Sequence, residues 1–113
     1  MIHRFQFKVV PTPVHPQFHK VKYGLLYFWL HAGSDKQAAA HQAATILAEL
    51  PYKQVSEYVT VLDGMLLGDD SIPAAAIAVR EELVRESGMA LLFLAVPVDP
   101  AGSEGGLAEF EAA

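Results

Sequence analysis

Polar aromatic side chains recur at alternate positions in the most apolar stretch of the chain. Tyr23, Tyr27 and Trp29 occupy odd positions, while the even positions from 24 to 30 carry only glycine, leucine and phenylalanine. Successive side chains of a strand point to opposite faces of its sheet, so these three rings share one face. A buried tyrosine or tryptophan needs a polar partner, whereas at a wet interface its polar atom stays in water. The pattern therefore predicts that one face of this strand is not an ordinary core.

Two further residues complete the candidate site. His31 shares the face of Trp29 and stands next to a loop, where an imidazole can contact a ligand or transfer a proton. Tyr58 belongs to a later strand whose polar positions would join the same face. We therefore expect Tyr27, Trp29, His31 and Tyr58 to form a ligand-binding site or an interface. A lone histidine is more often a hydrogen-bonded surface residue, so His31 has two interpretations.

The other histidines do not predict a metal site. His15 and His19 are four residues apart, which on a helix would place both imidazoles on one side of a metal ion. Prolines at positions 11, 13 and 16 fix the backbone in an extended form, so the spacing loses this meaning. We expect no bound metal.

No catalytic constellation can be assembled from the remaining residues. The chain has no cysteine, no glycine-rich phosphate loop, no serine elbow and no His-Glu-x-x-His helix. We therefore predict no catalytic residues and no cofactor.

Composition favours one compact domain with few classes of partner. The chain has 113 residues, of which 52% are hydrophobic, and a net charge of −5. This charge opposes a phosphate backbone, so nucleic-acid binding is not expected. No apolar run is long enough to cross a membrane and residues 1–8 do not resemble a signal peptide. The expectation is a soluble cytoplasmic protein.

Periodicity predicts strands and helices that would position the candidate site. Polar and apolar residues alternate over 3–9, which predicts an edge strand, and residues 22–30 form a central strand. A helix then begins with a capping box at Ser34 and ends at Pro51. A strand over 53–62 follows, with a hairpin turn at Asp63 and Gly64 and a short return strand over 65–67. A second helix begins near Asp70 and Ser71 and ends at Gly88. Its core stripe is expected to comprise Ile72, Ala76, Val79 and Leu83, with Ile77 and Val84 as an offset pair and Arg80 between them. A central strand follows over 91–98, and 99–113 is expected to be an irregular acidic tail.

These elements indicate an α+β fold. Without its first strand, the order is βαββαβ, which resembles the ferredoxin-like split βαβ sheet over residues 22–98. The resemblance implies two helices on one sheet face, an open opposite face and an extra N-terminal edge strand. Residues 1–98 would form the single domain. Because this fold hosts many unrelated functions, it implies none of them.

An open aromatic face favours a protein that binds something. The first interpretation is a non-catalytic interaction or regulatory module that forms a homodimer through this face or through the stripe of Ile77 and Val84. The alternative is a cofactor-independent protein or enzyme that binds a small molecule in an aromatic and histidine pocket there. An RNA-binding sheet would also use exposed aromatic residues, but its signature is missing and the charge is unfavourable.

Overall fold

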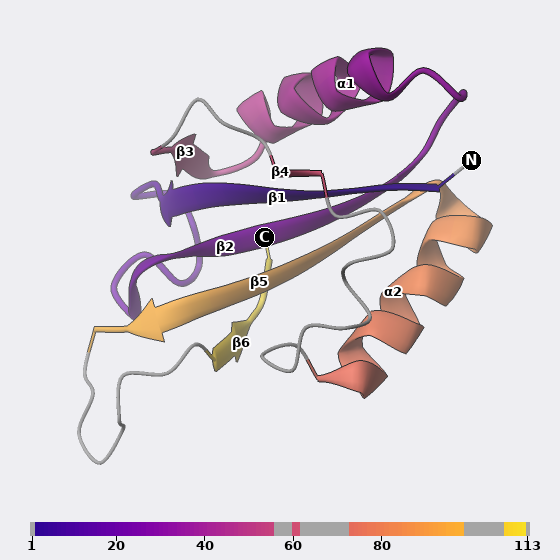
Figure 1. Cartoon of the computed structure of the whole chain (residues 1–113). Coiled ribbons are helices and arrows are strands. Elements are labelled where there is room, and N and C mark those ends of the chain that lie inside the picture. Colours follow the sequence, from indigo (N-terminus) through magenta and orange to yellow (C-terminus); the bar gives the residue numbers. More distant parts are fainter. Residues whose placement is uncertain (1, 56–59, 62–72, 99–107, 113) are drawn as a thin grey trace.

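A computed structural model describes residues 2–55, 60–61, 73–98 and 108–112 of the chain (Figure 1). Its elements are β1 (Ile2–Pro11), β2 (Val21–His31), α1 (Lys36–Ala48), β3 (Tyr52–Gln54), β4 (Thr60–Val61), α2 (Ala74–Ser87), β5 (Met89–Pro97) and β6 (Ala108–Phe110). The protein is therefore α+β, as predicted. The expected Asp63–Gly64 turn and the return strand over 65–67 lie outside the described residues.

All strands belong to one antiparallel sheet, in which the order is β3-β1-β2-β5-β6 and β4 also pairs with β1. The N-terminal strand is consequently an interior strand, and the prediction that it lies at an edge is wrong. The reason is that β1 and β2 form a long hairpin, which gives β1 one neighbour, while the short strands β3 and β4 cover its other side. This order is not that of the ferredoxin-like sheet.

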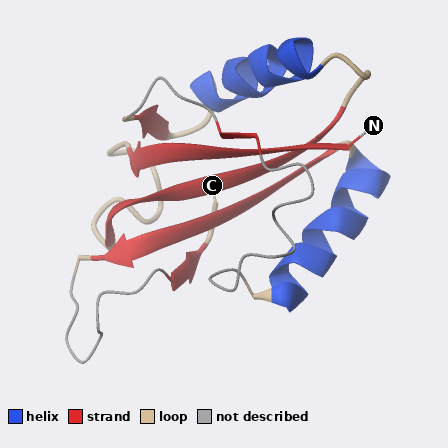
Figure 2. Ribbon diagram, in the orientation of Figure 1, coloured by secondary structure: helices blue, strands red, loops and turns tan. Residues whose placement is uncertain are grey.

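The two helices lie on opposite faces of the sheet (Figures 1 and 2). One core contains α1 together with Phe5, Phe7 and Phe28, and the other contains α2 together with Tyr27 and Trp29. The prediction of two helices on one face and an open opposite face is therefore wrong. Strands β2 and β5 are apolar on both faces, so each face needs its own cover to remove that surface from water.

The N-cap of helix α1 is Asp35, one residue after the predicted cap, Ser34. The carboxylate of Asp35, rather than the hydroxyl of Ser34, accepts hydrogen bonds from the backbone N–H groups of Gln37 and Ala38. Ala39, Ala43 and Leu47 are buried against the sheet. The helix ends at Ala48, two residues before the predicted last residue, Leu50.

Helix α2 presents a different stripe to the sheet than expected. Ala76, Ile77 and Val84 are buried, whereas Val79 and Leu83 are exposed. Ala76 is therefore buried as predicted, but the contact continues through Ile77 and Val84, the pair expected to be offset, instead of through Val79 and Leu83. Ile72 lies outside the described residues. The helix ends as predicted at Gly88, whose φ of 86° is in the left-handed region that glycine adopts without a steric cost.

A short strand lies in the segment expected to be irregular. Strand β6 pairs with β5 at the edge of the sheet, from Phe93 opposite Phe110 to Ala95 opposite Ala108. Arg80 joins α2 to this strand, because its guanidinium donates to the Leu91 carbonyl at 3.0 Å and to Glu109 at 2.9 Å. Arg80 thus finds the carboxylate that its place between two apolar stripes required.

Neither helix in the described part of the chain is long and apolar enough to cross a membrane.

Candidate functional site

The aromatic residues predicted for an exposed site are buried beneath α2. Tyr27 and Trp29 point to the α2 face of the sheet and pack with Ile77 and Val84 of the helix. Trp29 has 0% of its surface exposed and Tyr27 has 1%. The structure therefore places both residues on the face that the alternation predicted, but as core residues. They cannot contact a second chain or a ligand unless α2 moves away.

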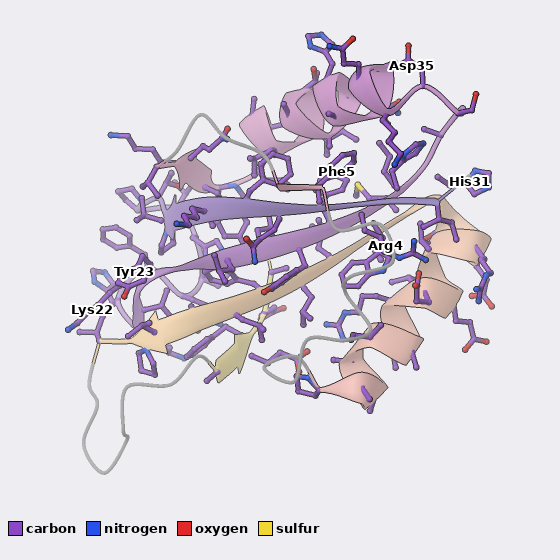
Figure 3. All side chains as sticks on the ribbon, viewed as in Figure 1. Arg4, Phe5, Lys22, Tyr23, His31 and Asp35 are labelled. Carbon is purple, nitrogen blue, oxygen red and sulfur yellow. The ribbon has the colours of Figure 1, made fainter. Side chains whose placement is uncertain are left out.

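Polar side chains of β1 lie beside these rings under the same helix. Arg4 is the cross-strand partner of Trp29, and its Nε and guanidinium nitrogen both donate to one carboxylate oxygen of Glu81, at 2.9 and 2.5 Å. Gln6 is the partner of Tyr27 and donates to its hydroxyl at 3.1 Å. Glu81 therefore belongs to a partly buried ion pair. Figure 3 shows Arg4 directed toward α2.

Buried polar atoms without a partner lie close to this ion pair in the fold. The Nε1 atom of Trp29 and the second carboxylate oxygen of Glu81 are buried and make no hydrogen bond within the described residues. An unpaired buried donor or acceptor costs about 1–3 kcal/mol. Together with the Arg4–Glu81 and Gln6–Tyr27 pairs, these atoms make the region beneath α2 more polar than an ordinary core.

His31 does not join Tyr27 and Trp29 in a pocket. His31 is exposed at the last position of β2, beside the C-terminal end of α2, where its backbone N–H donates to the Gly88 carbonyl at 2.9 Å. Figure 3 shows it at the opposite end of the sheet from Tyr23. Tyr58 lies outside the described residues.

The buried histidines have structural partners at opposite ends of the β1–β2 hairpin. His3 contacts the Gly33 carbonyl through Nε2 at 2.6 Å. His15 is enclosed by the rings of Tyr52 and Phe93, accepts from the Gln17 N–H through Nδ1 and donates from Nε2 to the Ala112 carbonyl. Within the described part of the chain, no three His, Asp or Glu side chains come together in a way that could hold a metal ion.

A groove lies on the α2 face beyond the end of the helix. It encloses about 600 Å³ and is bordered by β1, β2, β5 and the residue after β3. Its lining residues are Lys8, Val10, Tyr23, Gly24, Leu25, Val55 and Val96. This volume is typical of a small-molecule site.

The lengths of α2 and β1 explain why α2 does not cover this part of the face. Helix α2 has 14 residues and is about 21 Å long, while β1 has 10 residues and spans about 33 Å. The helix returns directly into β5 at Gly88, so it covers the sheet from the His31 end only. Helix α2 does not reach the end that carries Lys22 and Tyr23 (Figure 3).

A β-bulge shapes the open end. The pairing of β2 with β5 shifts between Val21 and Gly24, so Lys22 and Tyr23 together oppose Val96. Gly24 permits this close approach, because a Cβ there would lie 2.5 Å from the Leu94 carbonyl oxygen and 2.8 Å from the Ala95 Cβ. Tyr23 is 55% exposed as a result, in contrast to Tyr27 and Trp29 on the same strand.

The sequence identified the correct face but not the groove. The alternating pattern of rings includes Tyr23, which borders the groove. The contributions of Val10, Leu25, Val55 and Val96 were missed. Their one sequence signal is Gly24 within an otherwise apolar strand, which is typical of a bulge or of close backbone approach.

Comparison with protein-family models, curated proteins and solved structures finds no match for this chain.

Proposed function

We propose that this protein is a non-catalytic binding module whose recognition surface is the groove beyond α2. The observation that carries this proposal is the apolar floor of that groove, formed by the partly buried side chains of Val10, Leu25 and Val96. Burial of such a surface by a ligand is favourable by about 25 cal/mol per Å².

The chemistry of the lining supports binding rather than catalysis. Its polar side-chain groups are the amine of Lys8 and the hydroxyl of Tyr23. No serine, histidine or carboxylate lies among the described residues that line the groove, so these residues supply no nucleophile next to a general base.

Binding of a neutral apolar dye tests the apolar groove without any contribution from ligand charge. We expect N-phenyl-1-naphthylamine to bind the full chain and to fluoresce more strongly there. Val55→Asp places a carboxylate on the groove and should weaken dye binding. Val14→Asp is the matched control, because Val14 is 81% exposed and lies outside the groove. Equal binding by the two variants, or no dye binding at all, would contradict the proposal.

A homodimer is the second candidate, and it rests on two exposed apolar residues at the groove. Tyr23 and Val55 are each 55% exposed, and a second copy could cover them. The sequence favoured a dimer through Tyr27 and Trp29, but those residues pack under α2. Light scattering coupled to size exclusion should show a mass that falls on dilution and in Val55→Asp. A monomeric mass at every concentration would eliminate the dimer.

A further inference from the structure

Three lysines surround the groove on an otherwise acidic chain. Lys8 lines it, Lys53 is the cross-strand partner of Val10, and Lys22 shares the bulge opposite Val96. All three side chains are exposed, and none of them belongs to an ion pair within the described residues. The net charge of the whole chain is −5, so this group of three lysines is opposite in sign to the chain as a whole.

Among the described residues, the nearest acidic residue on this face by strand register already has a partner. Leu25 pairs with Leu94, which in turn pairs with Glu109 of β6. The Glu109 carboxylate accepts a hydrogen bond from Arg80 at 2.9 Å. Lys8 lines the apolar floor and its amine forms no ion pair within the described residues, whereas Arg4, four positions earlier on the same face, is paired with Glu81.

The position of Lys8 determines where a ligand's charge would lie. Lys8 pairs with Leu25, and its carbonyl accepts from the Val55 N–H at 3.0 Å, so its side chain emerges between these two apolar residues. A lysine in such a place lays its methylene stem on apolar surface and keeps its amine at the boundary with water. An anion bound to that amine could extend an apolar body over Val10 and Val96.

We propose that the groove binds a small organic carboxylate with an apolar body, and this inference rests on the proposed binding function. The carboxylate pairs with Lys8, with Lys22 and Lys53 adding a favourable potential, and the apolar part covers the floor. A second copy of the chain fits this surface less well, because it would place the lysines of one copy near those of the other.

Paired ligands of equal length separate this inference from the proposed function. Octanoate and octanol have the same alkyl chain but differ in charge. We expect calorimetric titration of the full chain to show octanoate binding about tenfold tighter than octanol. Added salt should reduce this preference, because ionic strength screens the exposed charges.

Two lysine variants locate the charge. Lys8→Gln should weaken octanoate binding about tenfold and octanol binding by much less, since octanol has no charge to lose a partner. Lys36→Gln is the matched control, since Lys36 begins α1 on the other side of the sheet, and it should not change either affinity. Thermal melts of both variants should be close to that of the unaltered chain, because both side chains are exposed.

Three other results would contradict either the carboxylate proposal or the binding function. Equal affinity for octanoate and octanol would overturn the carboxylate proposal while the binding function stands. Failure of both ligands and of the neutral dye would overturn the binding function itself. Association with phosphatidylglycerol vesicles without any binding of dissolved octanoate would identify a lipid surface as the anion and contradict a small-molecule site.

Discussion

At the scale of single residues, the buried polar groups are anchors for distant parts of the chain. The Ala112 carbonyl accepts hydrogen bonds from His15 and from the hydroxyl of Tyr52, which joins the C-terminal segment to the loop after β1 and to the start of β3. The rings of His15, Tyr52 and Phe93 also pack against one another. Three segments far apart in the sequence are therefore held at one point.

Burial gives Tyr52 a measurable signature at alkaline pH. Desolvation raises the pKa of its phenol well above the ordinary value of 10.0. Above pH about 10, the unfolded chain releases this proton while the folded chain retains it, so the unfolded state binds fewer protons. The stability present at lower pH is therefore lost as the pH rises through this range.

We predict that stability falls between about pH 9 and about pH 11 by about 1 kcal/mol more in the unaltered chain than in Tyr52→Phe. Urea unfolding of the two proteins at both pH values measures the difference. The variant lacks the Ala112 hydrogen bond and starts from a lower stability, so the comparison uses the change with pH. Identical losses would show that Tyr52 ionises normally in the folded chain.

At the scale of elements, the position and length of α2 decide which part of its sheet face is buried and which part is available for binding. Its buried residues close the face around Trp29, and its length leaves the groove open. Val84 is fully buried and the adjacent Leu83 is 43% exposed. Substitutions at these two neighbouring residues therefore test which side of α2 packs on the sheet.

We predict that Val84→Ala lowers the free energy of unfolding by about 2 kcal/mol, because it removes methyl groups from a packed core. Leu83→Ala should cost about 0.5 kcal/mol or less, as expected of a largely exposed position. Chemical denaturation of both variants tests this order. A larger loss in Leu83→Ala would mean that the stripe inferred from periodicity faces the sheet after all.

The alternating pattern of the strands could be read correctly from the sequence, but the covering of the sheet could not. The opposite faces of Phe28 and Trp29, the alanines of α1 and the end of α2 at Gly88 all depend on local geometry, which periodicity and capping express. The side of the sheet on which α2 lies depends on long-range packing. The buried pairing of Arg4 with Glu81 joins residues 77 positions apart, and no local pattern indicates it.

At the scale of the whole molecule, a sheet that is apolar on both faces needs two covers. Helix α1 supplies one of them, and α2 supplies most of the other. The aromatic face is therefore core at the His31 end and groove at the Tyr23 end. The proposed function depends on this division, since an uncovered Trp29 would make the whole face available for binding.

Acrylamide quenching of tryptophan fluorescence tests this division most directly, because Trp29 is the one tryptophan in the chain. With α2 packed over Trp29, we predict emission at short wavelength and weak quenching in the native protein. The emission wavelength and the extent of quenching should reach the values of exposed tryptophan only when the chain unfolds. Quenching in the native protein as strong as that in urea would contradict the covered face and would return Trp29 to the binding surface.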